Sequence, residues 1–158
     1  MGKGSLATVL ELTQTINGVQ GEGKLGFLPQ LSSDGSTLAV LSIVREPDPV
    51  EVPFLLKVFR KNHTTKQYEN VHTFNDINDY TIEGFGYGLN STGQFIAISY
   101  SKPPPDTDSK VVIFKHQNDT WVNYGTINPD QGEDNEFYSV SLSDDGNTIA
   151  IGNSGYKD

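Results

Sequence analysis

The 158-residue chain contains no cysteine, and only 11 of its residues are Lys or Arg against 20 Asp and Glu. Without cysteine, disulfide bonds, thiol catalysis and cysteine-ligated zinc are excluded. The resulting net charge of −9 argues against nucleic-acid binding, because proteins that bind nucleic acid cluster basic residues on one surface. The acidic balance permits cationic partners or calcium but indicates neither.

Long apolar runs are also missing. No stretch approaches the 18 residues that a membrane-spanning helix needs, and residues 1–10 are too weakly apolar for a signal peptide. If the protein is secreted, its signal lies outside this chain. No segment has helical periodicity of useful length. A chain that is 35% hydrophobic, with 16 glycines and 8 prolines, fits many short strands joined by turns. We therefore expect one all-β domain over residues 1–158.

A ten-residue motif occurs three times, at residues 31–40 (LSSDGSTLAV), 89–98 (LNSTGQFIAI) and 142–151 (LSDDGNTIAI). The leading leucines are 58 and then 53 residues apart. Each copy predicts a β-hairpin, with a glycine in the turn where the backbone needs positive φ. The strand after the turn alternates, which places Ala39, Ala97 and Ala150 on one face. We expect these alanines to be buried at equivalent places in three successive sheets.

Each repeat supplies four predicted strands. The first ends at the leucine, and the second comes after the turn. The third covers residues 54–61 and 110–116, and the fourth covers residues 10–16, 68–74 and 121–127. Four antiparallel strands per 53–58 residues indicate a β-propeller blade. The repeats then span about residues 10–67, 68–120 and 121–158. A β-sandwich is the alternative, but it has no reason to repeat one motif at this spacing.

The motif Ser-x-Asp-Gly-x-Thr-Leu/Ile-Ala-Val/Ile resembles the FG-GAP and integrin-α-like propeller repeats. Gly26 and Gly84 fall where the glycine of that family's Phe-Gly pair lies. The preceding phenylalanine and the Gly-Ala-Pro element of the family are absent, so the resemblance is to a divergent branch. It implies a β-propeller. Counting the predicted strands gives about two and a half to three blades in this chain, which is an incomplete ring because a closed propeller needs at least about four. The resemblance also implies a ligand-binding or scaffolding role, more often adhesive or structural than catalytic.

The sequence contains few candidates for a catalytic or metal-binding site. The acidic stretches at residues 106–108 and 128–134 lack the order of a calcium loop, so we favour solvated loops. His63, His72 and His116 occupy different strand positions, and we expect them to lie apart on the surface. No phosphate loop, paired carboxylates or Ser/His/Asp spacing stands out. The sequence therefore predicts no enzyme activity, no metal site and no cofactor.

Three asparagines, Asn62, Asn90 and Asn118, begin Asn-x-Ser/Thr sequons. Asn62 and Asn118 both fall between the third and fourth strands of a repeat, at the outer edge of a blade, where a glycan would fit. This placement favours an extracellular or cell-surface glycoprotein. The alternative is that these asparagines are ordinary turn residues.

The repeat pattern is incomplete at both ends, and the two ends lack different strands. The strand at residues 10–16 has no earlier strands of its own blade, and the third repeat lacks outer partners. Bare sheet edges invite pairing with other chains. We therefore expect residues 10–16 to lie against another copy of the chain, or against the rest of a longer chain, and to pair near the third repeat. The edge residues are Leu10, Leu12, Thr15, Ile16, Thr148, Ile149 and Ile151.

The leading functional hypothesis is a structural or adhesive protein that works by self-association. The alternative is a module that binds a carbohydrate or protein ligand at its loop face.

Overall fold

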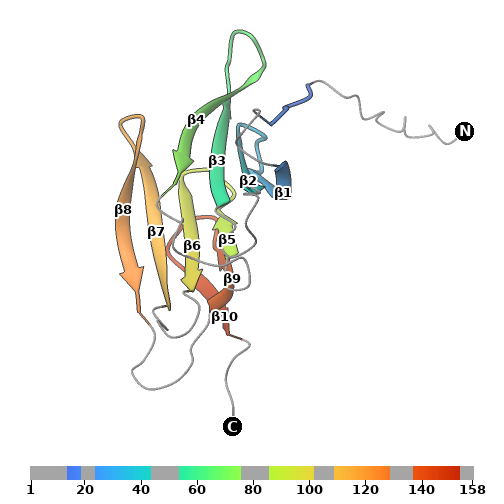
Figure 1. Ribbon diagram of the computed structural model, residues 1–158. Helices are drawn as coiled ribbons and strands as arrows, with labels where there is room; N and C mark the ends of the chain where they lie inside the picture. The colour runs from blue at the N-terminus through green and yellow to red at the C-terminus, as the bar shows by residue number, and fades with distance from the viewer. Residues whose placement is uncertain are drawn as a thin grey trace, which may run out of the picture.

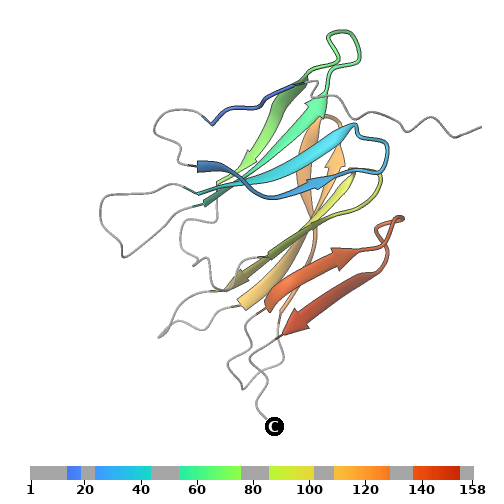
Figure 2. The same ribbon diagram turned by 90° about the vertical axis from the view of Figure 1, so that its right-hand side faces the viewer.

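The computed structural model describes residues 14–18, 24–43, 54–75, 86–101, 109–128 and 137–153. These residues form ten β-strands in three antiparallel sheets (Figure 1). Figure 2 shows the sheets arranged in a row, each turned relative to the last. In the part of the chain that is described, no helix is long and apolar enough to cross a membrane. The prediction of an all-β chain is confirmed.

Within each sheet the strands lie in chain order, so each pairs with its neighbours in sequence. Sheet 1 contains β1 (Lys24–Leu31), β2 (Thr37–Ile43), β3 (Phe54–Lys61) and β4 (Tyr68–Phe74). Sheet 2 contains β5 (Gly86–Leu89), β6 (Phe95–Ser101), β7 (Ser109–Gln117) and β8 (Thr120–Ile127). Sheet 3 contains β9 (Phe137–Leu142) and β10 (Ile149–Asn153). The four-stranded repeat is confirmed for sheets 1 and 2. The three sheets do not close into a ring (Figure 2).

The described part of the segment at residues 10–16, which was predicted to be a strand, does not form one. Residues 10–13 lie outside the described residues, and residues 14–16 are not in a strand. The Gln14 side-chain amide instead bonds to the edge of β4. Its Nε2 donates to the Tyr68 carbonyl at 3.2 Å, and its Oε1 accepts from the Tyr68 N–H at 2.7 Å. This part of the segment therefore contacts sheet 1 of its own chain, whereas the prediction placed it beside the third repeat.

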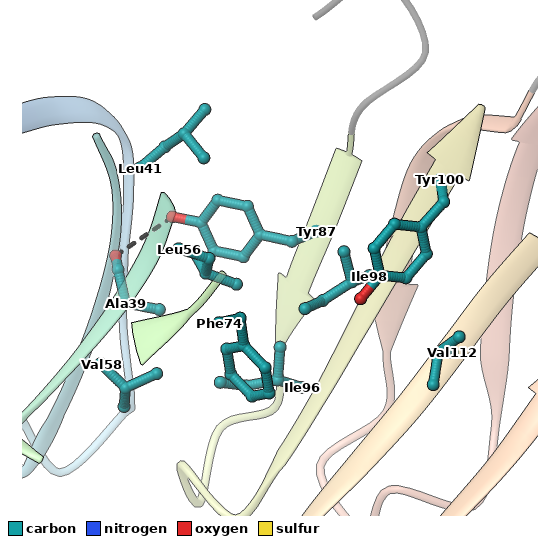
Figure 3. Close-up of a cluster of buried hydrophobic side chains, with 10 residues drawn as sticks. All are labelled: Ala39, Leu41, Leu56, Val58, Phe74, Tyr87, Ile96, Ile98, Tyr100 and Val112. Carbon is teal, nitrogen blue, oxygen red and sulfur yellow. Dashed lines mark hydrogen bonds between the residues drawn. The ribbon is translucent and has the colours of Figure 1, made fainter. Parts of the chain in front are cut away.

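The hydrophobic core lies between sheets 1 and 2 (Figure 3). We call the face that a sheet turns toward the next sheet its leading face, and the opposite one its trailing face. The leading face of sheet 1 contributes Ala39, Leu41, Leu56, Val58 and Phe74, and the trailing face of sheet 2 contributes Tyr87, Ile96, Ile98, Tyr100 and Val112. Each fully buried Leu or Ile side chain stabilises the fold by about 1.5–3 kcal/mol.

Tyr87 crosses this core. Its hydroxyl donates to the carbonyl oxygens of Ala39, at 3.1 Å, and of Leu28 (Figure 3). Burial raises the pKa of the Tyr87 phenol, because the charged phenolate would lose its hydration. The phenol therefore stays protonated at neutral pH and remains a hydrogen-bond donor between the two sheets.

The three repeated alanines differ in burial. Ala39 and Ala97 have 0% of their surface exposed, as predicted. Ala150 is exposed, so the prediction is wrong for the third copy. Sheets 1 and 2 each have another sheet against their leading face. Among the described residues, nothing lies against the leading face of sheet 3 in the same way.

Candidate functional site

The repeated motif folds into the same turn in each sheet. In sheet 1 the Ser32 N–H donates to the Thr37 carbonyl at 2.8 Å, and the Ser32 hydroxyl accepts from the Thr37 N–H at 2.9 Å. The Gly35 N–H closes the turn on the Ser32 carbonyl at 2.9 Å, with φ at +68°. Ser143 makes the same bonds in sheet 3, and the Asn90 side chain replaces the serine hydroxyl in sheet 2.

The acidic residue of the motif stabilises this turn. Asp34 Oδ1 accepts from the Ser36 N–H at 2.9 Å and from the Ser32 hydroxyl at 2.7 Å. These bonds, the Ser36 N–H first, lower the pKa of Asp34 to about 2. Asp145 makes equivalent bonds to Ser143 and Asn147, which also lower its pKa. The carboxylates are therefore committed to local hydrogen bonds, and the described residues contain no group of three potential metal ligands.

Successive turns stack on one another. A Cβ added at Gly93 would lie 2.6 Å from Thr37 Cβ, and one added at Gly146 would lie 2.5 Å from Phe95 Cδ2. Thr37 and Phe95 are equivalent, since each is six residues after the motif leucine. The glycine of one turn thus fits over the residue that ends the preceding turn. The equivalent residue in sheet 3 is Thr148, which is exposed.

Hydrogen bonds to main-chain carbonyl groups join the stacked turns. The Ser33 N–H donates to the Ser91 carbonyl at 2.7 Å, which joins sheets 1 and 2. Asn90 Nδ2 donates to the Asp144 carbonyl at 3.0 Å, which joins sheets 2 and 3. Each joint therefore combines a steric fit at a glycine with a polar bond to the next turn.

The first strands of successive sheets contact each other in two different ways. Gln30 Nε2 donates to the Tyr87 carbonyl at 2.8 Å, and Gln30 Oε1 accepts from the Leu89 N–H at 2.7 Å. One amide side chain thus bridges β1 to the backbone of β5. At the equivalent position Gly88 has no side chain, and a Cβ there would lie 2.9 Å from the Val140 carbonyl oxygen. Strand β9 therefore lies directly against β5.

The outer strands of sheets 1 and 2 meet in an aromatic cluster. The Phe74 ring centroid lies 4.7 Å from that of Phe114 and 6.0 Å from that of Trp121. His72 packs edge-on against Phe74, and His116 packs edge-on against Trp121. The expectation that the histidines lie apart on the surface is wrong for this pair, since both are half-buried and both pack on the same aromatic cluster.

His116 is half-buried, and this burial is the largest cause of its lowered pKa. The positive charge of Arg60 lowers the pKa further, Asp119 opposes the effect, and His72 adds to it. Neutral imidazole is therefore the favoured form of His116 in this joint.

The leading face of sheet 3 is open and lined by small residues. Residues on this face are exposed: Ser139, Ser141, Thr148, Ala150 and Gly152. Residues on the trailing face are half-buried against sheet 2: Val140, Leu142, Ile149 and Ile151. This strict alternation identifies which side of the hairpin packs on the molecule.

The predicted glycosylation residues have different surroundings. Asn118 is exposed in the β7–β8 turn, with φ at 48°. Asn62 is half-buried in the β3–β4 loop, where its Nδ2 donates to Glu69 Oε1 at 2.9 Å. Asn90 is 1% exposed, and its Nδ2 is bonded to Thr92 and Asp144. A glycan on Asn90 is incompatible with this burial, and the residue belongs to the turn.

The residues predicted to form assembly edges lie in different parts of the structure. Leu10 and Leu12 lie outside the described residues. Thr15 is exposed and Ile16 half-buried, and neither belongs to a strand. Thr148 ends the last turn, and Ile149 and Ile151 lie in β10, as expected. Sequence reasoning missed Gln30, although its place before the motif leucine, shared with Gly88 and Ser141, was a signal that it faces the next sheet.

A scan against protein-family models finds no match for this chain. A search of curated proteins finds none either. The likeness to FG-GAP repeats therefore stays a prediction.

Proposed function

We propose that this chain is a non-enzymatic structural or adhesive protein of the β-propeller type, in which each sheet is a blade. It functions by receiving a further blade on the leading face of sheet 3. The main support for this proposal is a difference in burial among the repeated alanines. Ala39 and Ala97 are fully buried beneath the next sheet, whereas Ala150, at the equivalent place, is exposed.

The chemistry of the open face supports close approach of another backbone. Its side chains are small, and no charged residue lies among Ser139, Ser141, Thr148, Ala150 and Gly152. The joint between sheets 2 and 3 uses the same kind of surface, because Gly88 admits the Val140 carbonyl. A blade added after sheet 3 would place its turn glycine over Thr148, as Gly93 lies over Thr37.

The added blade belongs to another copy of the chain or to the rest of a longer chain. Between copies the contact is head-to-tail, which gives rings if the rotation closes and filaments if it does not. We also propose an extracellular or cell-surface location. Asn118, in an exposed turn, and Asn62 both lie in loops between the third and fourth strands, where glycans fit.

The absence of cysteine allows a direct test. Ala150→Cys introduces a single thiol on the open face, and Gln67→Cys introduces one at an exposed position of the β3–β4 loop as a matched control. We expect the thiol at position 150 to react much more slowly than the control with a maleimide reagent in the assembled protein. Native mass, measured over a range of concentrations, then tells whether the covering blade comes from a second copy.

A monomer at every concentration, with both thiols equally reactive, would overturn the proposal. That result would favour the alternative of a ligand-binding module for a carbohydrate or protein.

A further inference from the structure

Ionisable side chains and aromatic rings gather at the outer end of the joint between sheets 1 and 2. They come from β3 and β4 of sheet 1 and from β7 and β8 of sheet 2. We call these residues the outer joint: Arg60, His72, Phe74, Phe114, His116 and Trp121. Phe74 is buried and the other five are half-buried, so water reaches this end of the interface only in part.

Arg60 and His116 are anchored to adjacent residues of one turn. Arg60 Nη2 donates to the Gly93 carbonyl at 3.3 Å, so this side chain crosses from sheet 1 to sheet 2. The His116 N–H donates to the Gln94 carbonyl at 2.8 Å. A guanidinium group keeps its charge at every pH at which proteins fold. Protonation of His116 therefore adds a second positive charge beside a permanent one.

The other charged groups around His116 do not balance this second charge. Asp119 is exposed in the β7–β8 turn, where water weakens its attraction. Glu69 pairs with Arg60 across the strands and is exposed as well. His72, on the facing strand β4, is another imidazole that gains positive charge as the pH falls. In acid, the outer joint therefore accumulates positive charge.

Two buried donors in the outer joint have no hydrogen-bond partner. They are the Nε–H of Arg60 and the Nε1–H of Trp121. Both groups can only donate, and a buried donor without an acceptor costs free energy. Separation of the two sheets at this end would let water accept from both groups. Aromatic packing therefore holds the outer joint closed against the demands of its polar atoms.

The inner part of the same interface does not respond to pH in this way. Leu56, Ile96 and Ile98 are fully buried and carry no titratable group. The Tyr87 phenol lies among them with a raised pKa, so it stays neutral as the pH falls. Acid therefore acts on the outer joint and leaves the inner packing unchanged.

We propose that the outer joint is a pH-sensitive switch, in which proton uptake by His116 separates sheets 1 and 2 at this end while the inner core stays packed. Burial, and then the positive charge of Arg60, lower the pKa of His116 from 6.5 in the closed joint. The open joint returns His116 to water, where it binds the proton more tightly, so protonation favours opening. The joint opens as the pH falls below 6.5 and closes as the pH rises. This inference does not depend on the proposed function.

The test uses Trp121, the only tryptophan of the chain, whose fluorescence reports on the outer joint alone. The full chain is titrated from about pH 8 to about pH 5, the range in which histidine changes charge. We expect the emission maximum to shift to longer wavelength and quenching by acrylamide to increase, with a midpoint below pH 6.5. Far-UV circular dichroism should stay constant, because the strands remain paired. Intensity alone is not used, since a protonated imidazole can quench an indole without any movement.

His116→Gln removes the titrating group and keeps a polar side chain, so the shift in emission should be lost. His63→Gln is the matched control, because His63 is exposed in the β3–β4 loop, outside the outer joint. The control should titrate as the unaltered chain does, and thermal unfolding at about pH 8 checks that both variants are folded.

A second measurement needs no variant. In nuclear magnetic resonance spectra of the unaltered chain, the Overhauser contact between the rings of Phe74 and Trp121 should disappear below the midpoint. The contact between the Tyr87 ring and Ala39 should persist, because it belongs to the inner core.

A constant emission maximum in the unaltered chain would overturn the switch, and so would an equal shift in His116→Gln. Emission and circular dichroism that change together at one midpoint would mean that the whole chain unfolds in acid, which would also overturn it.

Discussion

Substituting each of the three turn glycines by alanine separates two losses of stability, one from backbone strain within a turn and one from a steric clash between stacked turns. Gly35, Gly93 and Gly146 have nearly the same backbone, with φ at +68°, +68° and +70°. An alanine in this left-handed conformation costs about 1–2 kcal/mol at each site. Gly35 is the reference, because the nearest atom to an added Cβ is the Tyr68 hydroxyl at 3.9 Å, an ordinary contact.

The other two glycines lie in the joints between sheets. The added Cβ would lie 2.6 Å from Thr37 Cβ in Gly93→Ala and 2.5 Å from the Phe95 ring in Gly146→Ala. Overpacking of this kind adds about 1–3 kcal/mol. Since 1 kcal/mol changes the melting temperature of a chain this size by about 2–4 °C, these variants should melt about 2–12 °C below Gly35→Ala.

Thermal unfolding monitored by circular dichroism measures the difference. A double variant provides the control. In a Phe95→Ala background the ring is gone, so Gly146→Ala should cost no more than Gly35→Ala does in the unaltered chain. If the three single variants lose the same stability, the glycines serve only their own turns, and the stacked-turn joint is not a steric fit.

Three further outcomes are expected. Ala97→Leu should lower the free energy of unfolding by about 1–3 kcal/mol, because a larger side chain overpacks this buried site. Ala150→Leu should leave the melting temperature of the monomer unchanged, because Ala150 is exposed. Equal effects of the two substitutions would contradict the difference in burial. Burial and nearby positive charge lower the pKa of His116, so the unfolded chain takes up its proton first as the pH falls below 6.5. The free energy of unfolding, measured by denaturant titration, should then decrease below pH 6.5, and His116→Gln should make this decrease smaller. The same pH dependence in the variant and the unaltered chain would refute this prediction. Intact-mass analysis with and without glycosidase should find sugar on Asn62 and Asn118 in native material, and an unshifted mass would remove the argument for an extracellular location.

The hairpins were predictable from the sequence because their determinants are local. Ser32, Gly35 and Thr37 bond within six residues of one another, so the motif alone specifies the turn. The alternation after the turn likewise determined the face of Ala39 and Ala97. Repetition of the motif added the four-stranded order of sheets 1 and 2, since hairpin-connected strands pair with their sequence neighbours.

Features that depend on the placement of one sheet against another were not predictable. The exposure of Ala150 depends on whether another sheet packs on sheet 3, although its local sequence matches that of Ala97. The approach of His72 to the His116 region joins two repeats across a joint, and no spacing in the sequence encodes it. Gln14 was assigned to a strand because residues 10–16 hold the same place in the repeat as residues 68–74 and 121–127, but its side chain bonds to the backbone of Tyr68 instead.

The contrast between Gln30 and Gly88 has a consequence for the spacing of the sheets. A glutamine at this position holds two inner strands apart by the length of its amide side chain, and a glycine lets two backbones touch. The spacing between the first strands of neighbouring sheets is then set by one residue per repeat. A protein built from such repeats can bring neighbouring sheets closer together at their first strands, or hold them farther apart, by exchanging a single side chain in each repeat.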